Sequence, residues 1–237
     1  MIKAVIFDLN GTLIDIYTSE SDDNIYRTTA NFLDYHHIKI SPGKLREEFF
    51  DLMRRQKESS AEKFPEFDVV RLFSRIIAVY GSGKSDLDPK TAATIFRAAG
   101  RYKLQLYDGV LPVLQNLQKN YKFAAVSDGQ KIWAVPELHS VGLTEFFRTV
   151  IISSEYGFRK PDQRMYKMAL NKLKILPEEA VFVGNDMYRD IYGAREAGMK
   201  TVFFRSNQTE QCFNTVEADY IIYRFDELPS AIDFLDR

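Results

Sequence analysis

The 237-residue chain has a single cysteine, Cys212. One thiol cannot form a disulfide within the chain, and it cannot supply a zinc site built from several cysteines. The three histidines, His36, His37 and His139, do not have the spacing of a metal site either. The scarcity of cysteine favours a reducing, cytoplasmic environment, and any chemistry must depend on other residue types.

An excess of charge of one sign is also absent. The sequence contains 32 basic and 33 acidic residues, which give a net charge of -1. A nucleic-acid surface or a polybasic membrane patch would need a clear positive excess. No apolar run is long enough to span a bilayer, and the first residues do not resemble a secretion signal. We expect no nucleic-acid or membrane partner, and either a monomer or a homodimer.

Short apolar runs alternate with amphipathic stretches over most of the chain. The predicted strands are Ala4–Phe7, 123–126, 149–152, 180–183, 201–204 and 220–223. The helices predicted between the later strands cover 110–119, 132–141, 165–173 and 191–197. Strands separated by helices of this length form a parallel sheet with helices on both faces. The predicted fold class is therefore α/β, with a Rossmann-like parallel sheet.

The segment from Ile16 to residue 104 interrupts this alternation with helical periodicity. Ser41 and Pro42 have the residue types of a helix start, and Gly81 that of a helix end. The fourth of the helices predicted here includes Ile95, Phe96, Ala99 and Tyr102. We therefore predict an all-helical domain at 16–104, inserted after the first strand of a core domain formed by 1–15 and 105–237.

Polar clusters follow four of the predicted strands. They are Asp8–Thr12, Ser127–Gly129, Arg159–Asp162, and Gly184–Asp186 together with Asp190. Because the carboxyl ends of parallel strands share one edge of a sheet, these clusters should meet in space. Together they offer carboxylates, a hydroxyl group and a lysine. Phosphoryl transfer needs such groups, because lysine and Mg²⁺ neutralise the phosphoryl oxygens and carboxylates hold the metal.

These clusters resemble the four ordered motifs of the haloacid dehalogenase-like hydrolase superfamily. The matching segments are Phe-Asp-Leu-Asn-Gly-Thr-Leu at 7–13, Val-Ser-Asp-Gly at 126–129, Lys160-Pro161, and the segment 183–199. The resemblance covers nearly the whole chain, and the helical segment stands where one subfamily carries a helical cap domain. It implies a hydrolase with Mg²⁺ as cofactor and a small phosphorylated molecule as substrate.

The resemblance also implies roles for individual residues. Asp8 would attack phosphorus and form an aspartyl-phosphate. Ser127 and nearby backbone amides would hold the phosphoryl oxygens, and Lys160 would pair with both the nucleophile and the phosphate. Further substrate-binding candidates are Thr12, Asp128 and Gly129. Mg²⁺ would be bound by Asp8, the backbone carbonyl of Asn10, and Asp186, with Asp190 as a ligand or as support for one.

Two positions depart from the family pattern. Asn10 stands where most phosphatases of the family have a second aspartate, which protonates the leaving group and later activates water. An amide cannot transfer protons, and general acid–base catalysis contributes about 10²- to 10⁴-fold, so phosphatase turnover should be weak. Asn185 stands where the family usually has aspartate, with Asp186 one place later. If Asp186 turns inward, its spacing to Asp190 matches a shorter form of the motif.

Three explanations of Asn10 remain open. It is a designed substitution that traps a substrate, or it is native in a dehalogenase-type hydrolase that uses Asp8 on carbon without a metal. Alternatively, the chain is a binding protein of the same fold that has lost turnover. The acidic pair Asp186 and Asp190 suits metal binding better than metal-free chemistry. We therefore favour a Mg²⁺-dependent phosphatase with impaired or altered turnover.

Overall fold

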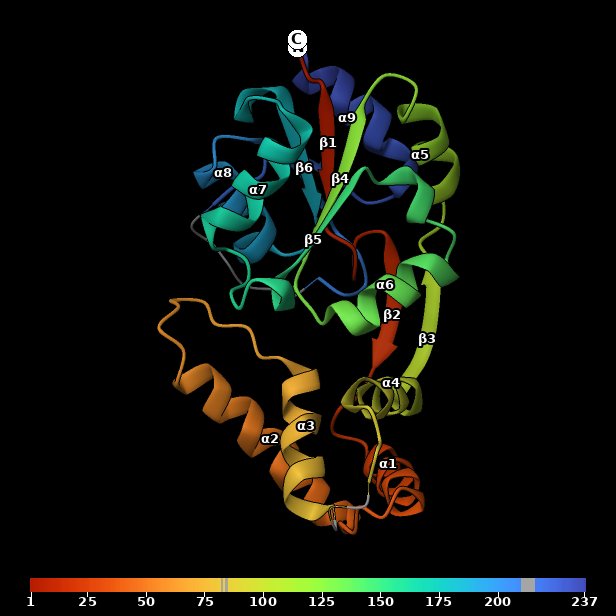
Figure 1. Cartoon of the computed structure of the whole chain (residues 1–237). Helices are drawn as coiled ribbons and strands as arrows, with labels where there is room; N and C mark the ends of the chain where they lie inside the picture. Colours follow the sequence, from red (N-terminus) through yellow and green to blue (C-terminus); the bar gives the residue numbers. More distant parts are fainter. Residues whose placement is uncertain (82, 84, 210–215) are drawn as a thin grey trace.

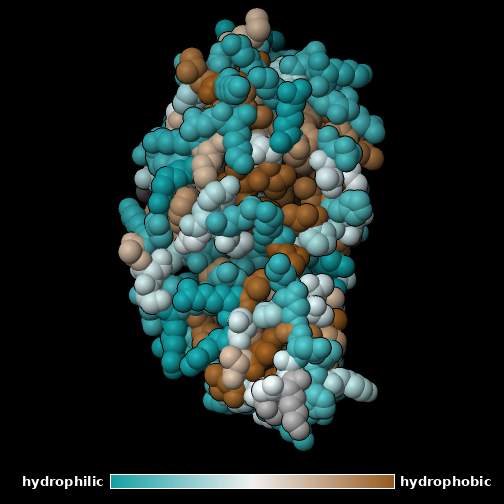
Figure 2. Space-filling view, viewed as in Figure 1, coloured by the Kyte–Doolittle hydropathy of each residue, from teal (hydrophilic) through white to brown (hydrophobic). Residues whose placement is uncertain are grey.

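The computed structural model describes residues 1–81, 83, 85–209 and 216–237, and Cys212 lies outside the described residues. Figure 1 shows an α/β part above and a helical part, made of helices α1 to α4, below it. In Figure 2, hydrophilic residues cover most of the face in view, with hydrophobic residues visible between them in both parts. Within the described residues, no helix combines the length and apolar character needed to cross a membrane.

In the described residues, six parallel strands form one sheet, in the order β5-β4-β1-β6-β7-β8. The strands are β1 Ala4–Phe7, β4 Lys122–Ser127, β5 Thr149–Ile152, β6 Ala180–Gly184, β7 Lys200–Phe204 and β8 Tyr220–Ile222. Each ends within one residue of its predicted bounds. Strand β1 lies inside the sheet, where Phe7 is opposite Ala125 of β4 and Val183 of β6. The residues that follow β1 therefore lie between those that follow β4 and β6.

Helices cover both faces of the sheet, as the α/β prediction requires. Helices α5 Val110–Leu117, α6 Lys131–Ser140 and α9 Leu228–Leu235 pack on the face that buries Val5 and Phe7. Helices α7 Gln163–Leu173 and α8 Gly193–Glu196 pack on the other face, with Ala4 and Ile6. This alternation along β1 follows from the two-residue period of a strand. Single 3-10 turns lie at Thr144–Phe146, Ser153–Glu155, Pro177–Glu179 and Phe225–Glu227.

The helical part has a hydrophobic core of its own. Its helices are α1 Asp23–Tyr35, α2 Pro42–Glu58, α3 Val69–Tyr80 and α4 Pro89–Gly100. The predicted helix signals are confirmed, since Ser41 caps α2, Pro42 is its first residue and Gly81 follows the last residue of α3. Phe96 of α4 stacks on Phe49 of α2 at 4.4 Å between ring centroids. Aromatic packing of this kind holds the four helices together.

Two strands that the sequence pattern does not predict connect the helical part to the sheet. Strand β2 Ile14–Thr18 pairs antiparallel with β3 Arg101–Leu106, and Figure 1 shows this pair running between the two parts. The prediction of helix from Ile16 onward was therefore wrong, as was the placement of Tyr102 in the fourth helix, which ends at Gly100. The predicted domain boundaries, after residues 15 and 104, fall within these strands.

The segment after β6 also differs from its prediction. Instead of one helix over 191–197, a π-helix at Met187–Tyr192 precedes the single α-turn of α8. Its first residue follows Asp186, whose carboxylate accepts hydrogen bonds from the N–H groups of Tyr188 and Arg189. This capping brings the start of the helix against the end of β6, next to the residues that follow β1.

Candidate active site

Asp8 is the first residue after β1, and its side chain is almost completely buried. The Lys160 ammonium donates a hydrogen bond to Asp8 Oδ1 at 2.6 Å. The Thr12 hydroxyl donates to Asp8 Oδ2 at 3.1 Å. Both carboxylate oxygens are therefore held in place, one by a cation and one by a neutral donor, as suits a positioned nucleophile.

Lys160 is only 3% exposed and bridges two carboxylates. Its ammonium lies 2.6 Å from Asp8 Oδ1 and 2.6 Å from Asp190 Oδ1. Burial acts to lower the pKa of Lys160, but the charges of Asp190 and Asp8 outweigh burial and raise that pKa above its usual value. Lys160 therefore carries a fixed positive charge next to the nucleophile.

Asp190 lies in the π-helix and is 1% exposed. Its Oδ2 accepts the backbone N–H groups of Asn185 and Asp186, each at 3.0 Å. Burial and the charge of Asp8 raise the pKa of Asp190, and the Lys160 ammonium acts against that rise. A Cβ atom at Gly184 would lie 2.3 Å from the Asp190 Cβ, so only glycine allows this approach. Asp190 thus orients Lys160 and the chain after β6.

Asn185 and Asp186 have different hydrogen-bond partners. The Asn185 Oδ1 atom also lies 3.1 Å from the Thr12 hydroxyl, so Asn185 and Asp8 share the single proton of that hydroxyl. Asp186 lines the same cavity, but its carboxylate pairs with Arg189 and not with Thr12: its Oδ2 accepts Arg189 Nε at 2.7 Å and its Oδ1 caps the π-helix. The backbone and guanidinium donors of Arg189 lower the pKa of Asp186, although burial opposes this.

The predicted phosphate-binding segment 127–129 begins at Ser127, the last residue of β4. Ser127 is 2% exposed. The Asp128 carboxylate accepts the backbone N–H of Lys160 at 2.9 Å and Arg159 Nε at 3.3 Å, so it fixes the segment that carries the lysine. The Gly129 N–H donates to Ser153 Oγ at 2.8 Å. All four polar clusters therefore lie at one edge of the sheet.

The oxygen donors near Asp8 fit a hard cation only in part. Within the described residues, no group of three or more His, Cys, Asp or Glu is arranged to hold a metal ion. The oxygens of Asp190 and Asp186 already accept N–H groups. Asp8, whose Oδ1 likewise accepts Lys160, and the neutral amide of Asn185 both lie beside the Thr12 hydroxyl. Oxygen is the donor type that Mg²⁺ prefers, but a single carboxylate supplies little charge.

A cavity of about 700 Å³ lies between this site and the helical part. Asp8, Asn10, Lys160 and Asn185 line it from the sheet edge. Residues that line it and were not predicted include Phe49, Phe50, Met53, Glu66, Arg97, Gln130, Trp133 and Glu137. Most of them belong to helices α2, α4 and α6, whereas Glu66 lies in a loop and Gln130 precedes α6. The spacing of a helix does not reveal which of its residues meet another domain.

An ion pair closes one side of the cavity. Arg97 of α4 donates to Glu137 of α6 through Nε at 2.7 Å and Nη2 at 3.2 Å, and the Arg97 guanidinium lies 5.0 Å from the centre of the Trp133 ring. The Trp133 indole N–H also donates to the Ala93 carbonyl at 2.8 Å. Helix α6 therefore contacts the helical part through both charge and ring stacking.

The site contains a buried carboxylate beside a buried lysine, at the carboxyl edge of a parallel sheet. Helices of a second part cover it. These features define an α/β protein whose active-site carboxylate lies under a helical domain. The family model described as haloacid dehalogenase-like hydrolase matches residues 5–204. The chain belongs to this family, and the resemblance seen in its motifs is confirmed.

Similar proteins include phosphatases and a dehalogenase. The glyceraldehyde 3-phosphate phosphatase of Pyrococcus furiosus is 30% identical over 241 residues, which cover 100% of this chain and 94% of that protein. The protein of the same name from Methanopyrus kandleri is 32% identical over 209 residues, covering 86% and 84%. The crystal structure of a 2-haloacid dehalogenase from Pseudomonas syringae matches with a TM-score of 0.70 and 21% identity over 99% of both chains. The last likeness shows the shared fold.

Proposed function

We propose that the chain hydrolyses a small phosphate monoester, with Asp8 as the nucleophile. The observation that carries this proposal is the pair formed by Lys160 and Asp8, 2.6 Å apart and buried at the wall of the cavity. A carboxylate next to a fixed cation suits attack on an anionic phosphoryl group, because the cation neutralises charge on both partners. Relatives about 30% identical to this chain carry the names of phosphatases for small phosphorylated metabolites.

In the proposed reaction, an Asp8 carboxylate oxygen forms a bond to phosphorus as the bond between phosphorus and the leaving oxygen breaks. Lys160 neutralises the phosphoryl oxygens, and the Ser127 hydroxyl donates to one of them. Water then attacks phosphorus, which releases phosphate and restores Asp8. The leaving oxygen must gain a proton and the water must lose one, and the Asn10 amide can do neither. We therefore expect slow turnover.

We propose Asp8, the Asn185 side-chain oxygen and the backbone carbonyl of Asn10 as the residues that hold Mg²⁺. When bound, the ion would neutralise phosphoryl charge, which is its usual contribution to such reactions. Asp190 and Asp186 act differently in this proposal, because their oxygens hold Lys160 and Arg189. The Asn185 amide where a carboxylate is usual implies weak metal binding, whereas Asn10 offers the same backbone carbonyl that an aspartate would.

We also propose that residues 16–104 act as a cap domain that selects the substrate. The two aromatic residues of α2, Phe49 and Phe50, line the cavity that Asp8 also lines. A cytoplasmic location for this enzyme, as a monomer or homodimer, is supported by the composition, with its single cysteine and balanced charge.

The placement of Asn185 favours one alternative function. Asn185, which faces Thr12, and Asn10 are both neutral. These two positions therefore add no carboxylate whose negative charge a metal ion would have to balance. Asp8 would then attack the carbon that carries a halogen in a 2-haloacid and displace halide, and water would hydrolyse the resulting ester. The carboxylate of such a substrate would need a cation, and Arg159 lines the cavity.

The proposal is tested by assaying the chain and its Asn10→Asp variant with a chromogenic aryl phosphate, with and without Mg²⁺. Restoring the acid should raise kcat by about 10²- to 10⁴-fold. Asp8→Asn is the control and should abolish turnover in both backgrounds. A covalent phosphate on Asp8 of the unaltered chain, detected by mass spectrometry, would show a trapped intermediate.

Two other outcomes would decide against the proposal. Halide release from 2-haloacids in the presence of EDTA, lost in Asp8→Asn, would establish the dehalogenase function. No turnover of either substrate class by the chain or by Asn10→Asp would favour a binding protein of this fold.

A further inference from the structure

A second cavity, of about 530 Å³, lies beside the first. It is lined by Lys57, Lys63, Phe64, Pro65, Arg159, Lys160, Pro161, Asp186, Met187, Tyr188 and Arg189. Arg159, Lys160, Asp186 and Arg189 line both cavities. The two spaces therefore share the wall that contains the lysine bound to Asp8.

The second cavity is strongly basic. Among the described residues that line it, three cations have carboxylate partners: Lys160 with Asp8, Arg159 with Asp128 at 3.3 Å, and Arg189 with Asp186 at 2.7 Å. Asp186 is the single acidic residue in the lining. The positive charges of the wall thus exceed its negative charge.

Lys57 and Lys63 differ from these three cations. In the described part of the chain, no carboxylate lies within 4.0 Å of either ammonium group. The Lys57 ammonium lies 5.5 Å from the centre of the Phe67 ring, and that of Lys63 lies 5.2 Å from the centre of the Phe64 ring. Contact with a ring holds an ammonium group without neutralising it. Both lysines are therefore available to bind an anion.

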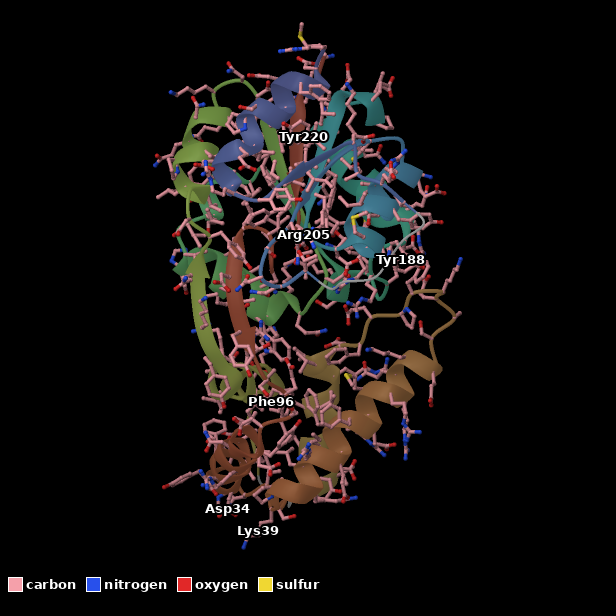
Figure 3. All side chains as sticks on the ribbon, turned by 180° about the vertical axis from the view of Figure 1, so that it is seen from behind. Asp34, Lys39, Phe96, Tyr188, Arg205 and Tyr220 are labelled. Atoms are coloured by element: carbon pink, nitrogen blue, oxygen red, sulfur yellow. The ribbon has the colours of Figure 1, made fainter. Side chains whose placement is uncertain are left out.

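The loop that contains Lys63 is hydrogen-bonded to the α/β part. The Glu66 N–H donates to the Gly157 carbonyl at 2.9 Å, and the Arg159 N–H donates to the Phe64 carbonyl at 2.9 Å. The Phe64 ring also meets Tyr188 edge-on, with 6.5 Å between ring centroids. Figure 3 shows Tyr188 in the α/β part, on the side toward the helical part. These contacts hold the basic residues of both parts around one space.

We propose that the second cavity binds a second anionic group of the substrate, a carboxylate or a phosphate a few bonds away from the phosphoryl group that Asp8 attacks. The inference rests on the proposed function and narrows its substrate class to phosphate monoesters with two anionic ends. Lys57 and Lys63 supply the unpaired charge that recognises the distal end, and Lys160 at the shared wall faces the end that reacts.

The test uses three substrates with the same propyl chain and one phosphate ester, whose other end is a hydroxyl, a carboxylate or a second phosphate. The unaltered chain should favour the two anionic-ended compounds by about tenfold in kcat/KM, as two partly exposed ion pairs would supply. The variant Lys57→Gln/Lys63→Gln should lose this preference. The preference should also fall as salt is added.

The matched control is Lys39→Gln/Lys90→Gln. Lys39 lies at the far end of the helical part in Figure 3, and neither lysine lines either cavity. This control should keep the full preference for an anionic end. Equal preference in the unaltered chain and in Lys57→Gln/Lys63→Gln would overturn the inference, as would the absence of any preference.

A binding measurement separates this inference from the proposed function. Calorimetry with inorganic phosphate and with pyrophosphate, in the presence of EDTA, requires no turnover. Pyrophosphate should bind more tightly than phosphate, and Lys57→Gln/Lys63→Gln should weaken pyrophosphate binding about tenfold while the control does not. If no substrate is turned over but this result holds, the proposed function fails and the subsite stands. Equal binding of both anions by all three proteins would remove the subsite.

Discussion

At the scale of single residues, the amide of Asn185 decides how much negative charge surrounds a metal at Asp8. Replacing Asn185 with aspartate adds a carboxylate beside Thr12 without changing the size of the side chain. We expect Asn185→Asp to bind Mg²⁺ at least about tenfold more tightly than the unaltered chain, which corresponds to about 1.4 kcal/mol. Isothermal titration calorimetry measures this directly, and the melting temperature of the variant should rise more steeply with Mg²⁺.

Asp186→Asn provides the comparison for that measurement. Because the Asp186 carboxylate is occupied by N–H groups of Tyr188 and Arg189, its loss should reduce stability but leave Mg²⁺ affinity nearly unchanged. If Asp186→Asn instead abolished Mg²⁺ binding and Asn185→Asp had no effect, Asp186 would be the metal ligand.

Glu66 makes stability depend on pH. Burial raises the pKa of Glu66 above its ordinary value of 4.5, although Arg159 and the Ser153 hydroxyl act against this. The folded state therefore holds the Glu66 proton more tightly than the unfolded chain does. Stability from this group is complete below pH 4.5 and declines as the pH rises through the folded pKa.

Glu66→Gln cannot titrate and isolates this effect. The free energy of unfolding of the unaltered chain, relative to Glu66→Gln, should fall as the pH rises above 4.5 and then level off. Urea unfolding of both proteins from about pH 5 to about pH 8 measures the difference. A difference that stays constant, or that grows in favour of the unaltered chain, would contradict the burial argument.

The residues around Asp8 were predictable to different degrees. Asp8, Lys160 and Asp190 could be placed together because each follows a recognisable strand or motif, and strand ends share one edge. The choice between Asn185 and Asp186 could not be predicted. It depends on the π-helix that begins after Asp186, and a change of one residue in a tight turn points a different side chain inward.

At the scale of helices and strands, the sequence predicts the elements that have a regular apolar pattern and does not predict those that lack one. The sheet strands are buried on both faces, so they read as continuous apolar runs. Strands β2 and β3 expose Tyr17 and Tyr102, which are 58% and 49% accessible, and their alternation is too short to distinguish from a helix face. Pairing between segments about 90 residues apart gives no local signal.

Packing around Phe96 should stabilise helix α4 within the helical part. This residue is 2% exposed and contacts Phe49, Phe73 and Trp133, so it joins α4 to its neighbours. Phe96→Ala should lower the free energy of unfolding by about 3–5 kcal/mol, because it leaves a cavity that rigid rings cannot fill. Phe96→Leu is the control and should cost clearly less. Equal, small losses in urea unfolding would show that α4 does not depend on this packing.

At the scale of the whole molecule, the cavity exists because two separately packed parts meet. The sheet has hydrophobic clusters on each face, and helices α1 to α4 have another. Trp133 belongs to α6 of the α/β part but packs within the cluster of the helical part. It is also the chain's single tryptophan, so its fluorescence reports how the two parts are docked.

The ion pair between Arg97 and Glu137 should fix this docking geometry while adding little net stability. Glu137 is 2% exposed, so removing its partner with Arg97→Met leaves a buried charge next to Arg101 alone, at 3.7 Å. We expect that variant to lose about 3 kcal/mol, whereas Arg97→Met/Glu137→Met should lose much less because no charge remains buried. Urea unfolding followed by Trp133 fluorescence measures both, and the double-mutant cycle gives the coupling energy. If the losses in the free energy of unfolding for the two single variants add up to the loss for the double variant, the two side chains act independently. The docking of the two parts would then depend on Trp133 and its ring contacts.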